Sequence, residues 1–268
     1  MSSQIYWNAN THVGRFRKNN EDAFLALKVS QEGAFRLGKE GEDSLDGSNY
    51  IFAVADGMGG AKAGEFASDV VREAVMQKLP TTFNPLIFSA DDALALLEVV
   101  YQETHSRLTW LGLNYEECRG MGSTLSLCWV ADSFAVLAHI GDSRIYHLGA
   151  GEALRQLSTD HTHAGWLYKN GELNERAFRG HPMRNALQQA LGGDARSIRP
   201  QFDRIDFSSD DQLLVCSDGL IEGLWDSGVR RLLRRREDER VACADRLIQE
   251  SVQVSGRDNT TAVVIARD

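Results

Sequence analysis

Short apolar runs that end in turn-forming residues alternate with amphipathic segments along most of this chain. Ile51–Ala55 and Leu213–Cys216 are continuous apolar runs, and each is followed within two residues by an aspartate and then a glycine. Runs of this length, bounded by glycine, predict buried strands. We therefore expect Asp56 and Asp218 at the ends of core strands.

The rest of the pattern predicts helices and further strands. Apolar residues recur at helical spacing over 64–79 and 91–111, and a third helix is expected around 241–251. Tight connections between the strands expected at 123–130, 133–140 and 144–148 predict an antiparallel meander. Two packed antiparallel sheets with helices on their outer faces, an α+β arrangement, would bury these apolar faces. The strands expected are 123–130, 133–140, 144–148 and 260–266.

Two segments depart from this pattern. Residues 31–49 contain four glycines among many charges and predict a solvent-exposed hairpin extension. Residues at about 160–184 are polar and weakly periodic, which predicts a flexible flap or irregular insertion. Neither segment resembles a linker, and the chain has no internal repeat and only four prolines. The sequence thus predicts a single domain over residues 1–268.

Composition excludes several classes of protein. With 268 residues and a formal net charge of −9, the chain lacks the basic face that a nucleic-acid binder needs. The basic run Arg230–Arg236 precedes Glu237–Glu239, which favours a solvated helix face with paired charges. No stretch could span a bilayer and no secretory signal is apparent, so we expect a cytoplasmic protein without membrane insertion. Four widely spaced cysteines fit buried thiols in a reducing compartment.

Acidic motifs are the main chemical signal. Glu21-Asp22, Asp56-Gly57, Asp218-Gly219 and Asp258-Asn259 are spread over the whole chain, and two of them close apolar strands. Carboxylates gathered at strand ends repel one another unless a cation neutralises them. Oxygen ligands of this kind suit hard metal ions. The sequence therefore predicts a metal-dependent enzyme.

Six motifs in order resemble the metal-dependent protein Ser/Thr phosphatases of the PPM family (protein phosphatase type 2C) in their bacterial form. The resemblance runs from Thr11 to Val264, and six ordered motifs are far more specific than any one of them. The motifs are Gly14-x-x-Arg17-x-x-Asn20-Glu21-Asp22, Ala53-Val54-Ala55-Asp56-Gly57-Met58-Gly59-Gly60, Met121-Gly122-Ser123-Thr124, Gly141-Asp142-Ser143-Arg144, Ser217-Asp218-Gly219 and Asp258-Asn259.

The resemblance implies a fold and an activity. The fold would be a four-layer α-β-β-α sandwich, with a cleft at one end that holds two Mg²⁺ or Mn²⁺ ions and in bacterial members a third, weaker one. A hydroxide that bridges the two ions would hydrolyse phosphoserine and phosphothreonine in cytoplasmic proteins. The expected partners are a phosphorylated protein substrate and a Ser/Thr kinase that the enzyme opposes, and a monomer is expected.

The same resemblance implies roles for individual residues. Asp56 would bridge both metals, the carbonyl of Gly57 would bind one, and Asp218 and Asp258 would hold the other. Asp142, with Asp218, would hold the third ion. The remaining residues are Glu21 and Asp22, which would touch the metals through coordinated waters, and Arg17, whose guanidinium would bind the phosphate.

Position 58 departs from the pattern of many eukaryotic members. Met58 stands where they carry a histidine proposed as the general acid, so the proton for the leaving group would come from another source. A water on the third metal near Asp142 is our candidate for that source. His161 is interpreted as a structural hydrogen-bonding residue, and His12 replaces a frequent aspartate without removing a metal ligand.

Alternative interpretations of the motifs are weaker. Each aspartate-glycine pair alone is a common turn signal, and only their ordered combination favours a metal site. Gly57–Lys62 lacks the third glycine of a dinucleotide-binding loop, and Gly141–Ile145 has isoleucine where a nucleophile elbow needs glycine. A non-catalytic module that binds phosphoproteins or scaffolds an assembly is the remaining alternative. Loss of metal ligands would be its signature, and the sequence shows none.

Overall fold

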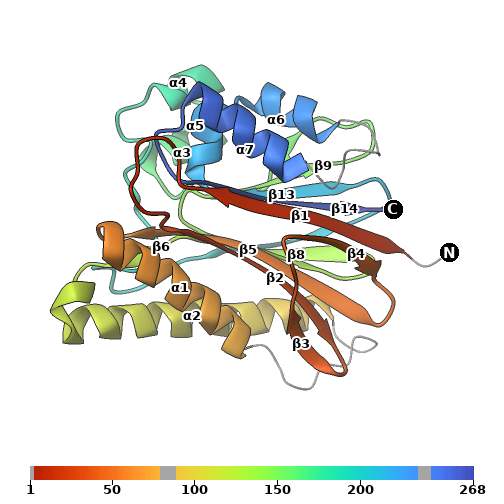
Figure 1. Cartoon of the computed structure of the whole chain (residues 1–268), viewed down its shortest axis with the longest axis horizontal. Coiled ribbons are helices and arrows are strands. Elements are labelled where there is room, and N and C mark those ends of the chain that lie inside the picture. Colours follow the sequence, from red (N-terminus) through yellow and green to blue (C-terminus); the bar gives the residue numbers. More distant parts are fainter. Residues whose placement is uncertain (1–2, 79–88, 235–242) are drawn as a thin grey trace.

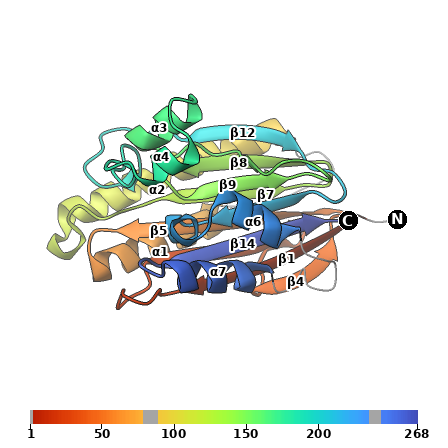
Figure 2. The same ribbon diagram turned by 90° about the horizontal axis from the view of Figure 1, so that it is seen from above.

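Two antiparallel sheets lie face to face in the computed structural model, which describes residues 3–78, 89–234 and 243–268. Figures 1 and 2 show α1 and α2 over the outer face of one sheet and α5, α6 and α7 over the other. The predicted four-layer α-β-β-α sandwich is confirmed. The helices are α1 (Ala61–Lys78), α2 (Ala90–Asn114), the 3-10 helix η1 (Glu116–Cys118), α3 (His163–Lys169), α4 (Glu175–Arg179), α5 (Asp218–Gly223), α6 (Asp226–Leu233) and α7 (Cys243–Val254).

The order of strands mixes distant parts of the chain in both sheets. The first sheet runs in the order β10 (Arg155–Gln156), β9 (Arg144–Leu148), β13 (Gln212–Cys216), β14 (Thr260–Arg267), β1 (Gln4–His12) and β4 (Glu40–Ser44). The second runs in the order β11 (Leu191–Gly192), β6 (Gly122–Ser123), β5 (Ser48–Met58), β7 (Leu125–Val130), β8 (Phe134–Ile140) and β12 (Gln201–Asp206), with β2 (Asp22–Ser30) also paired to β5 and β3 (Gly33–Arg36) beside β2.

The apolar core has three layers, and strand β5 explains why its sequence lacks alternation. Ile51 and Ala53 pack in the layer under α1 and α2, whereas Phe52 and Val54 pack in the layer between the sheets. Because both faces of β5 are covered, every position of the run is apolar. A third layer lies between the first sheet and α5, α6 and α7. The four cysteines are buried free thiols.

The predicted meander is wrong at its third strand. β7 pairs with β8, but β9 pairs with β13 and β10 in the other sheet. The chain changes sheets at Gly141–Ser143, where Gly141 has φ +115° and a Cβ would lie 2.4 Å from the Thr124 side chain. Glycine permits both this backbone conformation and this close approach. The crossing leaves Asp142 between two strands of different sheets.

The two irregular segments also differ from expectation. Residues 31–49 form no hairpin of their own, because β3 pairs with β2 and β4 pairs with β1 at the edges of different sheets. The predicted flap contains α3 and α4 and is more regular than its sequence suggested. Its predicted mobility stays a prediction.

The predicted helix boundaries are close to the observed ones where the structure describes both. The helices expected over 64–79, 91–111 and 241–251 correspond to α1, α2 and α7, although residues 79, 241 and 242 lie outside the described residues. The predicted pairing of the basic run with 237–239 also lies outside them, and Arg231 instead pairs with Glu250 of α7. In the described part of the chain, no helix combines the length and apolar character needed to cross a membrane.

Candidate active site

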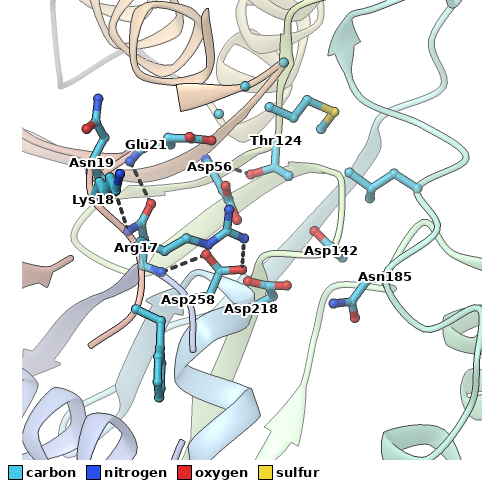
Figure 3. A pocket seen from close by; sticks show the side chains of 17 residues that line it. Arg17, Lys18, Asn19, Glu21, Asp56, Thr124, Asp142, Asn185, Asp218 and Asp258 are labelled. Atoms are coloured by element: carbon cyan, nitrogen blue, oxygen red, sulfur yellow. Dashed lines mark hydrogen bonds and ion pairs between the residues drawn. The ribbon is translucent and has the colours of Figure 1, made fainter. Parts of the chain in front are cut away.

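A cleft of about 720 Å³ opens at one end of the sandwich, where strands of both sheets end. Asp56 lies near the end of β5, Asp218 begins α5 directly after β13, and Asp142 lies in the crossing from β8 to β9. Figure 3 shows their carboxylates pointing toward a common space. The predicted residues that line the cleft are Arg17, Glu21, Asp56, Gly57, Asp142, Asp218 and Asp258.

Asp22 is the one predicted site residue that does not line this cleft. It lies opposite Asp56 in the register of β2 and β5, and it is 8% exposed. Its Oδ2 accepts hydrogen bonds of 2.7 Å from the hydroxyls of Ser217 and Thr261. These bonds tie the start of β2 to the turn that precedes Asp218. Asp22 thus supports the acidic site from behind.

Asn259 organises the loop that carries Arg17 and Glu21. Its side-chain Nδ2 donates to the carbonyls of Val13 (2.9 Å) and Asn19 (3.0 Å). Its Oδ1 accepts from the backbone N–H of Glu21 at 2.8 Å. One amide therefore closes the whole loop against the turn before β14. The sequence interpretation named Asn259 only as the neighbour of Asp258. Glu21 and Asn259 are 238 residues apart, so the sequence gave no sign that they contact each other.

Thr124 holds Asp56 in place in a similar way. Its Oγ1 lies 3.0 Å from the backbone N–H of Asp56, which donates to it, and 2.8 Å from the hydroxyl of Ser143. The backbone N–H of Thr124 donates to the carbonyl of Asp56 at 2.8 Å. The end of β5 is thereby fixed to the crossing that carries Asp142.

Two glycines allow α1 to approach the acidic end of β5 closely. A Cβ on Gly57 would lie 1.9 Å from the carbonyl oxygen of Gly64 in α1. A Cβ on Gly64 would lie 2.5 Å from a carboxylate oxygen of Glu21 and 3.0 Å from the carbonyl oxygen of Gly57. The first distance excludes a side chain on Gly57 without backbone movement, and a Cβ on Gly64 would displace the Glu21 carboxylate. Gly64 was missed by the sequence interpretation, because a glycine in an amphipathic helix has no distinguishing pattern.

The carboxylates raise one another's pKa. Burial, then the negative charges of Asp22, Asp218 and Asp142, holds the pKa of Asp56 well above its usual range. Burial and the charge of Asp142 do the same for the pKa of Asp218. Burial, with the charge of Asp160, raises the pKa of Asp142 to about 7, and burial raises the pKa of Asp22 to about 6. Without a cation, these groups hold protons that ordinary aspartates lose.

The donor set fits divalent metal ions with oxygen ligands. The Oδ1 atom of Asp218 is buried and has no hydrogen-bond partner among the described residues, which is costly for a carboxylate unless a cation is present. In the geometry of residues 3–78, 89–234 and 243–268, however, no three acidic, histidine or cysteine side chains converge closely enough to enclose an ion. A metal would therefore draw these carboxylates closer together.

Arg17 and Asp258, predicted to bind phosphate and metal, bind each other. Nη2 of Arg17 lies 2.6 Å from Oδ2 of Asp258, and the Arg17 side chain is 49% exposed (Figure 3). The hydrogen bond to Asp258 raises the pKa of Arg17 further above its usual value. A half-exposed ion pair of this kind is weak and exchanges its partners readily. Both side chains can thus turn to stronger partners.

The other positions singled out in the sequence lie as follows. Met58 lines the cleft and offers no titratable proton. Nδ1 of His161 accepts from the backbone N–H of Gly141 at 3.0 Å, which agrees with a structural role. Nδ1 of exposed His12 accepts from the backbone N–H of Gly14 at 2.8 Å.

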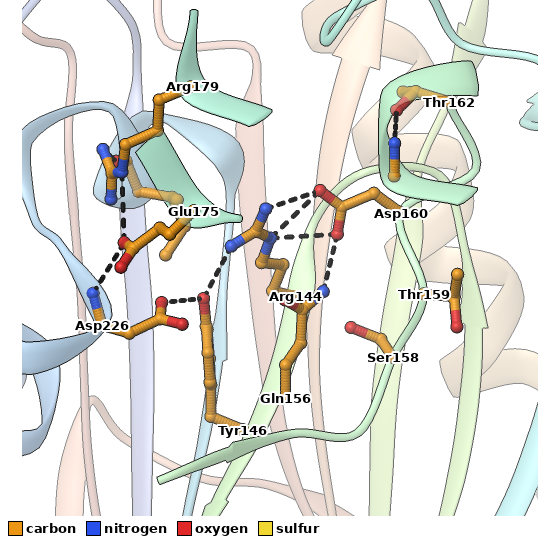
Figure 4. Close-up of polar contacts among 12 residues, drawn as sticks. Arg144, Tyr146, Gln156, Ser158, Thr159, Asp160, Thr162, Glu175, Arg179 and Asp226 are labelled. Carbon is orange, nitrogen blue, oxygen red and sulfur yellow. Dashed lines mark hydrogen bonds and ion pairs between the residues drawn. The ribbon is translucent and has the colours of Figure 1, made fainter. Parts of the chain in front are cut away.

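A polar network joins the flap to β9 and to the start of α6 (Figure 4). Arg144, two residues after Asp142, binds Asp160 at the start of the flap through three contacts of 2.8 to 3.1 Å. The two side chains are 2% and 4% exposed. At the far side of the flap, Arg179 of α4 donates to the carbonyls of Ile221 and Leu224, at the end of α5. Side-chain contacts therefore anchor the predicted flap at Asp160 and Arg179.

Comparison with known proteins gives consistent matches. The family model described as "Protein phosphatase 2C" matches residues 37–249. A serine/threonine phosphatase, Stp, of Listeria monocytogenes is 31% identical over 258 residues, which are 96% of this chain and 94% of the relative. The crystal structure of the Mycobacterium tuberculosis phosphatase PstP/Ppp has a TM-score of 0.79 at 29% identity and covers 98% of both chains. A structure of the PstP catalytic domain in complex with two manganese ions has a TM-score of 0.77 at 29% identity, over 99% of both chains.

Breaking the Arg144–Asp160 pair should destabilise the protein strongly. Asp160→Asn leaves a guanidinium buried without its counter-charge, which typically costs about 3 to 5 kcal/mol. The matched control is Asp43→Asn, because Asp43 pairs with Lys28 at 2.7 Å but both side chains are about one-third exposed, and such pairs contribute at most about 1 kcal/mol. Urea unfolding measures both variants. Equal losses would contradict the importance of the buried pair.

The stability of the metal-free protein should fall as the pH rises. The folded-state pKa of Asp142 is about 7 and that of Asp22 about 6, whereas both are near 4 in an unfolded chain. The folded state therefore binds more protons between about pH 4 and 7, and its free energy of unfolding decreases across that range. Urea unfolding of chelator-treated protein at pH 5.5, 6.5 and 7.5 tests this, and Mn²⁺ should cancel the decrease. A free energy that increases with pH in the chelated protein would disprove the prediction.

Proposed function

The chain belongs to the protein phosphatase 2C family, and from this premise we propose how its residues carry out the hydrolysis of phosphoserine and phosphothreonine. As a member, it is a metal-dependent serine/threonine protein phosphatase. The observation that carries the proposal for its site is the gathering of mutually repelling carboxylates, from five separate parts of the chain, in one cleft. A binding module that had lost catalysis has no use for this costly arrangement.

We assign the metal ligands among the residues of the cleft. Asp56 would bridge two ions, the Gly57 carbonyl would complete the site of one, and Asp218 and Asp258 would hold the other. Asp142 would bind a third ion together with Asp218. When bound, the ions supply a hydroxide at neutral pH and neutralise the phosphate. Both Mg²⁺ and Mn²⁺ accept such oxygen ligands, and Mn²⁺ is expected to bind more tightly in vitro.

Arg17 changes partner in this proposal. If a metal binds Asp258, the guanidinium of Arg17 would be released and could bind two phosphate oxygens in a bidentate manner. The half-exposed position of Arg17 at the cleft allows that rotation. Glu21 would order waters around the metals, and its backbone N–H is held by Asn259. Asp22, which does not line the cleft, would support the site through Ser217 and Thr261. Met58 cannot protonate the leaving group.

The substrate is proposed to be a phosphorylated protein, and a Ser/Thr kinase would supply it. Phe16 and Lys18 flank Arg17 on the rim of the cleft, and Phe16 is 71% exposed. They offer apolar and cationic contacts to residues beside the phosphorylated one. Asn185 and Leu187, just after the flap in the sequence, also line the cleft. An open cleft with such a rim suits a peptide better than a small metabolite, which needs enclosure.

Asp218→Asn should abolish turnover while the fold persists. The substitution removes one metal ligand at nearly constant volume, and even a residue behind a ligand typically contributes 10- to 100-fold. We expect kcat on a phosphothreonine peptide to fall more than about a hundredfold at saturating Mn²⁺. Asp46→Asn, at an exposed aspartate remote from the cleft, is the matched control. Wild-type rates in Asp218→Asn would refute the ligand assignment, and a wild type that is inactive with every metal would refute the function.

Arg17→Ala should affect substrate binding more than metal binding. The variant lacks the phosphate contact, so KM should rise about tenfold or more with a smaller change in kcat. Because the variant also frees Asp258, calorimetric Mn²⁺ affinity should be equal to or higher than that of the wild type. Arg17→Lys keeps the charge without the bidentate geometry and should lie between the two. Weakened Mn²⁺ binding with an unchanged KM would contradict the assignment.

A further inference from the structure

A second groove lies at the C-terminal end of α2, in the helical layer that α1 and α2 form. Its volume is about 810 Å³, larger than that of the catalytic cleft, and the two share no lining residue. The walls of this α2 groove are residues 105–113 of α2, residues 119–121 after η1 and the loop 193–196. In Figure 1 this end of α2 projects at the left of the helical layer. The metal site gives it no role.

One side of the α2 groove presents large apolar side chains to solvent. Trp110 is 55% exposed and Leu113 is 81% exposed, although both belong to a helix whose other face packs in the core. The Trp110 ring lies edge-on to Tyr115, with centroids 5.8 Å apart. This contact holds the indole in place at the surface. Large apolar residues clustered beside a groove are typical of a site of protein interaction.

The other side of the α2 groove is cationic. Arg119 and Arg196 come from separate segments and are both exposed. Neither guanidinium makes a hydrogen bond, ion pair or ring contact with any described residue. Only one carboxylate, Asp194, lines the groove with them in the described part of the chain. Guanidinium groups left free in this way favour ligands that carry several carboxylates.

The floor of the α2 groove is rigid. His105 is 7% exposed, and its Nδ1 accepts from the backbone N–H of Gly192 at 3.0 Å. Gly193 N–H donates to the Met121 carbonyl at 2.7 Å. Burial lowers the pKa of His105, so its ring stays neutral. The positive charge of the groove therefore comes from its arginines. The site is therefore formed before any ligand binds.

The α2 groove is next to the catalytic cleft. Met121 lines the groove and Gly59 lines the cleft, and a Cβ on Gly59 would lie 2.9 Å from the Met121 Cα. The following residue, Gly122 of β6, pairs with Met58 of β5 in the cleft. One extended peptide could thus reach from one site to the other.

We propose that the α2 groove binds an acidic peptide segment with a bulky apolar side chain, contributed by a partner protein. Arg119 and Arg196 bind its carboxylates, while Trp110 and Leu113 contact the apolar side chain. That the partner is the phosphoprotein substrate rests on the proposed function, because the neighbouring cleft would then act on the same chain. Binding to the groove itself requires no catalysis.

The test measures binding without hydrolysis. The probe is a fluorescein-labelled, unphosphorylated peptide with glutamates and aspartates around one phenylalanine, and fluorescence anisotropy follows its titration with the full chain and Mn²⁺. We expect binding that Arg119→Glu and Arg196→Glu each weaken about fivefold or more. Trp110→Ala should weaken it by a similar factor. Arg36→Glu is the matched control, because Arg36 is an exposed arginine of β3 without a partner among the described residues.

Three results would overturn the proposal. The first is an acidic peptide that does not bind. The second is equal binding to the wild type, Arg119→Glu and Arg196→Glu, which would place the peptide at the metal-loaded cleft or elsewhere. The third is equal affinity for a peptide in which lysines replace the acidic residues. Hydrolysis of a phosphothreonine peptide, measured separately, tells failure of this proposal from failure of the phosphatase assignment.

Discussion

Repulsion among buried carboxylates is the constraint on which the rest of this structure depends. Asp56, Asp142 and Asp218 meet at the ends of core strands, where burial and mutual charge raise the pKa of each. The fold must supply enough stability elsewhere to tolerate this acidic cluster. Three continuous apolar layers provide it. Under the proposed ligand assignment, a divalent cation would turn this unfavourable cluster into a binding site.

The hydrogen bonds and glycines around the cluster hold the carboxylates together without neutralising their charges. Thr124 fixes the end of β5 to the strand crossing, and Asn259 fixes the loop of Glu21 to the turn before β14. Both act through neutral hydrogen bonds, to backbone groups and to the Ser143 hydroxyl, so they leave the carboxylates free for a metal. Gly57 and Gly64 allow α1 to pack against the end of β5 without displacing the Glu21 carboxylate. The site is thus held by its surroundings and stays open at its centre.

The sequence predicted the site better than it predicted the strand pairing. Each acidic motif directly follows or precedes an apolar run, so local order alone placed Asp56 and Asp218 at strand ends. The meander failed at β9, because a short turn such as Gly141–Ser143 fits equally well between neighbouring strands or between sheets. That choice is decided by packing, here by the close approach of Gly141 to Thr124. Local pattern carries no information about it.

Contacts between distant residues were the other part that the sequence could not provide. The ion pair of Arg17 with Asp258 joins positions 241 residues apart, and it satisfies two charges that the metal and the phosphate would otherwise claim. The pair of Arg144 with Asp160 was equally unforeseen, because the motifs around the two residues do not show that they contact each other. Both pairs depend on which loops the fold brings together.

The two ion pairs differ in a way that matters for catalysis. Arg17 and Asp258 are partly exposed, so their separation is cheap and can accompany the binding of metal and phosphate. Arg144 and Asp160 are almost fully buried, so their separation is costly and the pair opposes movement of the base of the flap. Since Arg144 follows Asp142 by two residues and α5 begins with Asp218, the fixed sides of the flap share elements with the ligands. A displacement of the flap would therefore disturb Asp142 and Asp218, the proposed metal ligands, and the buried pair opposes it.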